Sequence, residues 1–167
     1  LTKIHKQQKT IAEQLAEAKR QQAAFAQITA DMAEGLLVID EHGALLSVNP
    51  SALRLLEAKE VQPSENVLAL NRSEPFRSVV QEALLGEHAQ VYIEGDEFTC
   101  EVIASPVKEG RETTGAILIL MDVTERERGE RMRREFTSNV SHELKTPLTS
   151  IYGVSDMLAS GMVKPED

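Results

Sequence analysis

The sequence predicts an α+β fold, in which a five-stranded antiparallel sheet with flanking helices lies between two long terminal helices. Three observations lead to this prediction. Residues 1–30 lack glycine and proline. Residues 31–123 alternate short apolar runs with glycine-containing turns. Beyond residue 124, apolar residues recur at helical spacing among charged ones.

The N-terminal segment, residues 1–30, is predicted to form one long helix because it is rich in Ala, Gln, Lys and Glu, which favour helices. Apolar side chains recur every seven residues, at Ile4, Ile11, Ala18, Phe25 and Met32. That spacing is typical of a parallel coiled coil. It favours self-association over the alternative, a single amphipathic helix packed against its own domain.

The middle segment opens with a predicted hairpin, formed by apolar runs at 35–40 and 44–48 around a turn that contains a glycine. Asn49 then suits the cap of a short helix. Pro50 occupies the first helical position, where its missing N–H costs nothing, and the helix is expected to end at residue 56.

A second helix is predicted from Ser73 to about residue 85, just before Gly86. Three further strands follow, at about 90–94, 98–105 and 115–122. Two strands, two helices and three strands in this order predict an antiparallel sheet with its helices on one face.

A long C-terminal helix is predicted to begin at Thr124. Thr124 and Glu127 fit a capping box, in which the hydroxyl accepts from a helix amide and the carboxylate reaches back. Apolar side chains follow one stripe at four-residue intervals, at Met132, Phe136, Val140 and Leu144. His142 lies off this stripe, so it is expected to face solvent while the stripe packs on a partner chain. The residues from Gly161 onward, with Pro165 among them, are expected to end the helix.

The most informative segment, residues 136–151, reads FTSNVSHELKTPLTSI. A neutral imidazole is a good nucleophile, and Glu143 beside His142 could accept its ring proton or fix its tautomer. Thr146 lies four residues beyond His142 on roughly the same helix face, where its hydroxyl could orient a water. Pro147 bends a helix at a cost of about 3 kcal/mol, so stability alone does not select it. A lone histidine beside a glutamate is usually a solvated surface pair; the whole string favours a chemical role.

Length and composition limit the possible functions. A chain of 167 residues has room for one globular domain plus extended helices. A net charge of -9 without a basic stripe argues against nucleic acid as a partner. The single cysteine, Cys100, excludes an internal disulfide and is expected to be a small buried hydrophobe. No apolar run approaches the roughly 20 residues of a membrane span.

Residues 141–148, SHELKTPL, resemble the phosphoacceptor box of the dimerisation and histidine-phosphotransfer domain of sensor histidine kinases. The resemblance implies that His142 is phosphorylated on a ring nitrogen from ATP and then passes the phosphoryl group to an aspartate of a response-regulator receiver domain. It implies an acid-base role for Glu143. It also implies that Thr146 positions the water of a reverse phosphatase reaction and that Pro147 bends the helix.

Residues 31–123 resemble a PAS sensor domain through GLLVID at 35–40, VNPSA at 48–52 and DVTE at 122–125. The resemblance implies the strand order and a sensory cavity, whose ligand is unknown: a small apolar molecule or none. His42 and His88 are expected to be solvated loop residues rather than metal or haem ligands. The cavity is expected to be lined by apolar strand residues, for example Val91, Ile93, Val102, Ile117 and Ile119.

These resemblances divide the chain into a coiled-coil signalling helix (1–30), a PAS sensor domain (31–123), a helical linker (124–135) and an incomplete first phosphotransfer helix (136–167). No glycine-rich phosphate loop occurs in the sequence. The chain is therefore expected to be a fragment of a histidine protein kinase that cannot phosphorylate itself. It is expected to hold no cofactor or metal; ATP and magnesium are implied for a missing catalytic domain.

The expected partners are a second copy of the chain, which would form a homodimer through the helices, and a response-regulator receiver domain. The chain begins at Leu1 without a methionine, so it is expected to be a fragment of a longer protein. The resemblance to sensor histidine kinases implies that it is the cytoplasmic portion of a cell-membrane protein, attached only through missing upstream segments. Two alternatives stay open: a PAS-based dimeric signalling scaffold with a vestigial histidine helix, and a small-ligand-binding module without kinase activity of its own.

Overall fold

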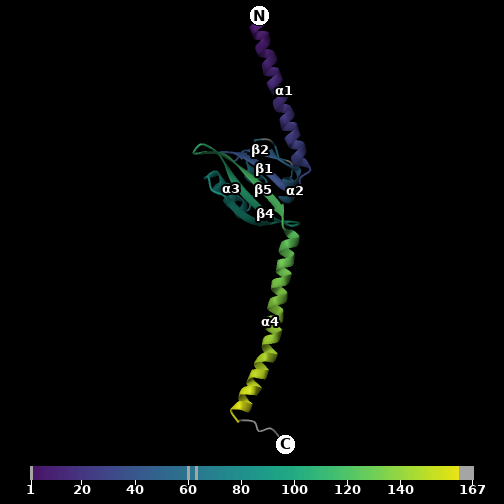
Figure 1. Cartoon of the computed structure of the whole chain (residues 1–167), viewed down its shortest axis with the longest axis vertical. Helices are drawn as coiled ribbons and strands as arrows, with labels where there is room; N and C mark the ends of the chain where they lie inside the picture. Colours follow the sequence, from purple (N-terminus) through teal and green to yellow (C-terminus); the bar gives the residue numbers. More distant parts are fainter. Residues whose placement is uncertain (1, 60, 63, 162–167) are drawn as a thin grey trace. The chain divides into compact units, whose positions relative to one another are not determined.

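The computed structural model describes residues 2–59, 61, 62 and 64–161. The chain divides into two compact units, residues 1–124 and 125–167. The first unit contains a long helix and a five-stranded sheet with its covering helices, and the described residues of the second belong almost entirely to one long helix (Figure 1).

The elements follow one another in the predicted order, with one short 3-10 helix, η1, that the sequence did not indicate. Their bounds are α1 (Thr2–Ala30), β1 (Gly35–Asp40), β2 (Leu45–Val48), α2 (Pro50–Leu55), η1 (Val67–Ala69), α3 (Glu74–Leu84), β3 (Ala89–Glu94), β4 (Thr99–Glu109), β5 (Glu112–Asp122) and α4 (Thr124–Ala159). Asn49 caps α2, as predicted, and Ser73, the predicted start of the second helix, caps α3; both side chains accept from backbone N–H groups.

The five strands form one antiparallel sheet in the order β2-β1-β5-β4-β3, which confirms the predicted fold class. The last strand, β5, lies at the centre of the sheet between β1 and β4. Helix α2 packs on β1 and β5, whereas α3 packs on β3, β4 and β5. The chain therefore enters and leaves the sheet on neighbouring strands.

The hairpin of β4 and β5 extends further than predicted. The predicted strands end at residue 105 and resume at 115, but pairing continues until Glu109 lies opposite Glu112. Gly110 closes the turn with a φ of 65°, which favours glycine. A prediction from the apolar pattern places the end of a strand where the apolar residues end. Hydrogen bonds between strand backbones do not require buried side chains, so the pairing continues through polar positions.

The hydrophobic core fills the space between the sheet and its two covering helices. Phe76 of α3 is its largest fully buried side chain, and the sheet contributes Leu37, Leu118 and Leu120, all fully buried. A fully buried Phe or Leu side chain contributes about 1.5–3 kcal/mol relative to an exposed one. The core is thus the main source of stability in the first unit.

The prediction that Ile117 and Ile119 line a cavity is wrong. They are 36% and 41% exposed, on the sheet face opposite the core. Side chains alternate between the two faces of a strand, and Leu118 already occupies the inner face. The other residues of that prediction do lie with the core: Ile93 and Val102 are buried in it, and Val91 is partly buried and packs against it.

One buried side chain, Asn49, joins the end of α1 to the sheet and to α2. Its Nδ2 donates to the carbonyl oxygens of Thr29 and Glu34, at 2.9 Å each. Its Oδ1 accepts from the backbone N–H groups of Leu36, at 2.8 Å, and of Ala52, at 2.9 Å. Asn49 therefore uses both amide hydrogens and both lone pairs, a larger role than the helix cap that the sequence predicts.

The heptad pattern of α1 ends one repeat earlier than predicted. Helix α1 ends at Ala30, so Met32 lies outside it. The carbonyl oxygen of Met32 instead accepts from Ser51 Oγ at 2.6 Å, where the chain turns toward β1. The other large heptad side chains, such as Ile4 and Ile11, are exposed, and their pairing in a coiled coil stays a prediction.

Cys100 lies in the core with 1% of its surface exposed, which confirms that it is a buried hydrophobe. Burial raises the pKa of its thiol to about 12. The thiol is therefore protonated and shielded at neutral pH. Its reaction with a thiol reagent would report an opening of the core.

Helix α4 begins at Thr124, as predicted, but the predicted capping box is wrong. Thr124 Oγ1 accepts from the backbone N–H of Thr99, at 2.9 Å, instead of from an amide of its own helix. Asp122 supplies the local acceptor, since its Oδ1 accepts from the N–H of Thr124 at 2.9 Å. A local motif gives no sign that a strand residue competes for the hydroxyl.

Helix α4 ends at Ala159, and Gly161, where the predicted helix stop begins, follows with a φ of 73°. The rest of the predicted stop, Pro165 included, lies outside the described residues. No helix in the described part of the chain has both the length and the apolar character that crossing a bilayer requires.

Candidate functional site

Helix α4 carries all three predicted site residues. His142, Glu143 and Thr146 lie near its middle, and all three are exposed. Residues three or four apart on a helix are neighbours, with their Cβ atoms about 5–6 Å apart. Thr146 is therefore next to both other residues, and α4 presents an imidazole, a carboxylate and a hydroxyl to solvent in one patch.

The hydroxyl of Thr146 differs from the next two hydroxyls along α4. Thr149 Oγ1 donates to the carbonyl oxygen of Lys145 at 2.7 Å. Ser150 Oγ donates to the carbonyl oxygen of Thr146 at 3.1 Å. Among the described residues, Thr146 Oγ1 has no partner of this kind. It is left to solvent, where it could hold a water.

Pro147 lies inside α4, directly after Thr146. Because proline has no N–H, the carbonyl oxygen of Glu143, four residues earlier, loses its helical donor. The backbone is thus weakened in the same turn that carries His142. The helix bend expected from Pro147 stays a prediction.

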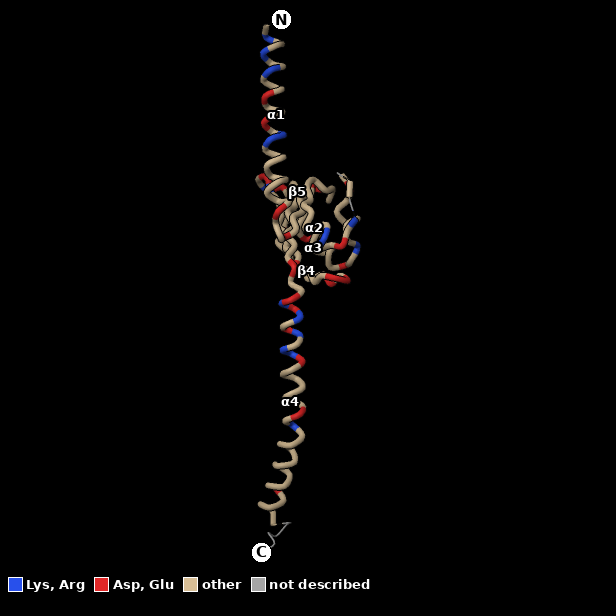
Figure 2. The backbone as a smooth tube through the Cα atoms, turned by 90° about the vertical axis from the view of Figure 1, so that its right-hand side faces the viewer, with Lys and Arg blue, Asp and Glu red and all other residues tan. Residues whose placement is uncertain are grey.

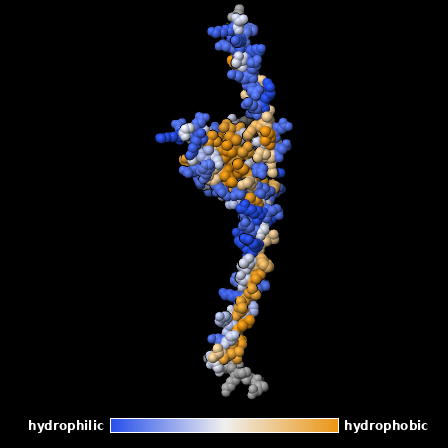
Figure 3. Space-filling model, viewed as in Figure 1, coloured by the Kyte–Doolittle hydropathy of each residue, from blue (hydrophilic) through white to orange (hydrophobic). Residues whose placement is uncertain are grey.

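One side of α4 is apolar and uncovered (Figure 3). No described residue of α4 is buried, and Met132, Phe136 and Leu144 are 65%, 70% and 54% exposed. Exposed apolar side chains gathered in this way mark an interaction surface. His142 is two residues from Leu144, or roughly 200° around the helix, so a partner on the apolar side would leave the imidazole accessible.

The first turns of α4 are densely charged (Figure 2). Arg128 pairs with Glu125 at 3.1 Å, and Arg134 pairs with Glu127 at 4.0 Å. Most of these side chains are exposed, so each pair is worth at most about 1 kcal/mol. These first turns are a solvated charged segment, which lies in the sequence between the last strand of the sheet and the apolar stripe.

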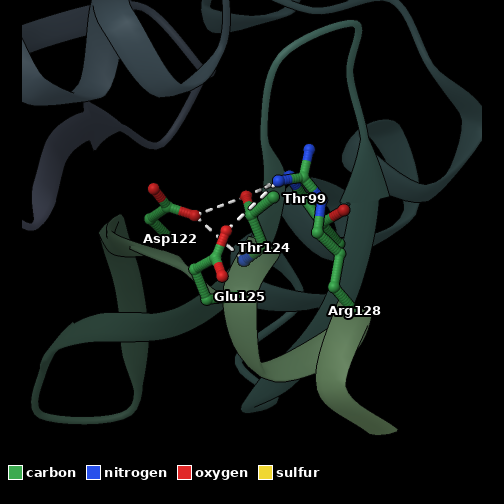
Figure 4. A network of polar contacts seen from close by, with 5 residues as sticks. All are labelled: Thr99, Asp122, Thr124, Glu125 and Arg128. Atoms are coloured by element: carbon green, nitrogen blue, oxygen red, sulfur yellow. Dashed lines mark hydrogen bonds and ion pairs between the residues drawn. The ribbon is translucent and has the colours of Figure 1, made fainter. Parts of the chain in front are cut away.

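The residues around the start of α4 include a contact that sequence reasoning missed (Figure 4). The backbone of Thr99 makes two hydrogen bonds there, one with the first residue of α4 and one with the residue that follows β5. Its N–H donates to Thr124 Oγ1, and its carbonyl oxygen accepts from the N–H of Val123, both at 2.9 Å. The partners are about 25 residues apart in sequence, and no local pattern could have revealed them.

The two loop histidines are exposed, as predicted. His88 Nδ1 lies 3.2 Å from Ser105 Oγ, and His42 Nδ1 lies 3.9 Å from a carboxylate oxygen of Glu41. Within the residues that the structure describes, no group of three or more His, Cys, Asp or Glu side chains is placed to hold a metal ion.

Two protein families match the chain. Residues 23–123 match the PAS fold family. Residues 132–167 match the His Kinase A (phospho-acceptor) domain family. The second match contains His142, Glu143, Thr146 and Pro147.

Curated relatives are similar along most of the chain. It is 33% identical to the sensor histidine kinase WalK of Bacillus subtilis over 151 residues, which is 86% of the chain and 24% of that protein. It is 32% identical to the sensor protein kinase WalK of Staphylococcus aureus over 162 residues, which is 95% of the chain and 39% of that protein. The chain thus spans well under half the length of either relative.

A solved structure of an RNA-binding light-oxygen-voltage receptor has a similar fold. It is 21% identical, with a TM-score of 0.53, over 72% of this chain and 38% of the receptor chain. At this identity the likeness concerns the fold alone, and it agrees with the five-stranded sheet and its covering helices.

Proposed function

The chain belongs to the PAS family and carries a histidine kinase A phospho-acceptor segment, and from this we propose that it is the sensory and phosphoacceptor part of a two-component sensor histidine kinase. The observation that carries the proposal is the position of His142. It is exposed in the matched segment of α4, away from the apolar stripe and one turn from a free hydroxyl.

In the proposed reaction, a ring nitrogen of His142 attacks the γ-phosphorus of ATP. A nitrogen–phosphorus bond forms while the bond to the leaving ADP oxygen breaks. Glu143 takes the proton that the imidazole then has to lose, as a general base. The phosphoryl group passes next to an aspartate of a response-regulator receiver domain, and the imidazole is restored.

Thr146 acts in the phosphatase reaction, which removes the phosphoryl group from the regulator. Its hydroxyl, free of the helix backbone, orients a water that hydrolyses the aspartyl phosphate of the regulator. ATP and magnesium belong in this proposal to a catalytic domain outside this chain, so the chain alone does not phosphorylate itself. The described residues offer no cluster that would hold the metal.

The parts of the chain have distinct roles in this proposal. Residues 1–30 connect an upstream input to the PAS domain at 31–123, and the linker at 124–135 connects that domain to the phosphotransfer helix at 136–167. A second copy of the chain covers the apolar stripe of α4. The chain is the cytoplasmic portion of a cell-membrane protein, and its PAS ligand, if it has one, is unassigned.

The experiment that tests this function is incubation of the full-length protein with ATP labelled at the γ-phosphate. We expect label that is lost in acid and kept in base, because acid promotes hydrolysis of the nitrogen–phosphorus bond of a phosphohistidine. Label that survives acid would indicate phosphoserine or phosphothreonine. That result, or the absence of label, would overturn the proposal.

The roles of Glu143 and Thr146 can be separated by substitution. Glu143→Gln should slow labelling by about 10²-fold or more, since a positioned general base typically contributes that much. Thr146→Ala should leave labelling within about twofold but slow hydrolysis of the phosphorylated regulator by about tenfold or more. The assays are initial rates of labelling and of regulator dephosphorylation. If both variants impaired the same reaction equally, these roles would be wrong.

A further inference from the structure

Glu57, an exposed residue that follows the cap of α2, binds the turn between β3 and β4. Its Oε1 accepts from the backbone N–H groups of Glu97, at 2.7 Å, and Phe98, at 3.4 Å. Its Oε2 accepts from the N–H of Asp96 at 3.1 Å. These hydrogen bonds, the one from Glu97 above all, lower the pKa of the Glu57 carboxyl. One ionised side chain therefore holds three consecutive amides of a distant turn.

The backbone on both sides is shaped for this contact. Glu57 has a φ of 52°, a left-handed conformation that residues with side chains rarely adopt. In the turn, a Cβ on Gly95 would lie 2.6 Å from Glu57 Oε1, so glycine leaves the room that the carboxylate needs. The turn itself is closed by the N–H of Gly95, which donates to the carbonyl oxygen of Phe98 at 2.9 Å.

The residue that follows the turn held by Glu57 is hydrogen-bonded to the start of α4. Thr99, the residue after Phe98, donates its N–H to Thr124 Oγ1 and accepts from the N–H of Val123. Thr124 is the first residue of α4. Glu57 is thus linked to Thr124 by its hydrogen bonds to the turn, by the peptide bond from Phe98 to Thr99, and by the hydrogen bond from Thr99 to Thr124.

We propose that Glu57 is a positioning residue that fixes the start of α4 by holding the β3–β4 turn, and thereby sets the rate at which His142 is phosphorylated. The second part rests on the proposed function, because it requires that the PAS domain controls α4. Glu57 lies on the surface, outside the hydrophobic core, so its contacts can open without unfolding the domain. It is thus placed to adjust the helix start independently of stability.

Glu57→Gln tests this inference with little change in shape. The glutamine keeps one acceptor oxygen but replaces the other with an NH2 group, which is a donor. That group would face a backbone N–H, so at least one of the three hydrogen bonds is lost. Hydrogen exchange of the full-length protein should become about tenfold faster at residues 96–98 and should also rise at Val123 and Thr124. The rate of ATP labelling should change at least severalfold, while the thermal midpoint stays nearly constant.

Two further variants locate the effect along these linked contacts. Thr124→Val removes the acceptor for the Thr99 N–H, so exchange should rise at Thr99 and Val123 but not at 96–98. Glu41→Gln changes an exposed acid of the β1–β2 turn and should leave both exchange and labelling unaltered.

Faster exchange confined to residues 96–98 in Glu57→Gln, or unchanged labelling despite exchange that spreads to Thr124, would overturn the inference. If the wild-type protein took up no label, the proposed function would fail instead. The exchange pattern would still decide whether Glu57 positions the start of α4.

Discussion

Replacing His142 by Gln should abolish ATP labelling and signalling output while leaving the fold intact. The glutamine amide is not a nucleophile that can carry the phosphoryl group. The fold should survive because His142 is exposed on a helix with no buried residue, and exposed substitutions usually change stability by less than about 0.5 kcal/mol. The measurements are label incorporation by the full-length protein and expression of a reporter for its signalling pathway.

His88→Gln is the matched control, because His88 is also exposed but lies in the PAS domain, hydrogen-bonded to Ser105. It should retain both label and output. The pair of variants also tests the scaffold alternative, since a scaffold with a vestigial helix would keep its output without His142. Retention of label in His142→Gln would show that the phosphoryl group is carried elsewhere.

Phe76→Ala should lower the free energy of unfolding of the PAS domain by about 3–5 kcal/mol. Phe76 is fully buried between α3 and the sheet, and its removal leaves a cavity that the surrounding strands cannot close. Labelling of Cys100 can follow the transition, because that thiol is 1% exposed and becomes reactive only when the core opens. The midpoint of labelling in urea should fall accordingly.

Leu85→Ala is the control for this measurement. Leu85 follows α3 directly and is 82% exposed, so its truncation should change the free energy of unfolding by less than about 0.5 kcal/mol. Equal midpoints for Phe76→Ala and wild type would contradict the assignment of Phe76 to the core.

Local sequence signals predicted the elements well. Strand β1 has the predicted bounds, and Asn49 and Ser73 cap their helices, because caps, turns and apolar runs are encoded within a few residues. The phosphoacceptor box around His142 could also be recognised, since the spacing of its residues on a helix follows from the sequence alone.

Long-range partners were not predictable in the same way. The sequence did not reveal that Thr124 bonds to Thr99 rather than to its own helix, nor that Glu57 holds a turn about 40 residues away. The prediction that Ile117 and Ile119 lie on the buried face of the sheet failed for a related reason. A strand of consecutive apolar residues gives no alternation from which to choose its buried side, and only packing of α2 and α3 decides it.

The most direct test of the phosphoacceptor role is to locate the phosphoryl group by mass spectrometry of the labelled full-length protein, digested with trypsin at neutral or basic pH. Cleavage after Arg134 and Lys145 releases residues 135–145, EFTSNVSHELK, which contain His142 together with Thr137, Ser138 and Ser141. We expect fragment ions that place the phosphate on His142. Phosphate on one of the three hydroxyl residues, or on another peptide, would contradict the account.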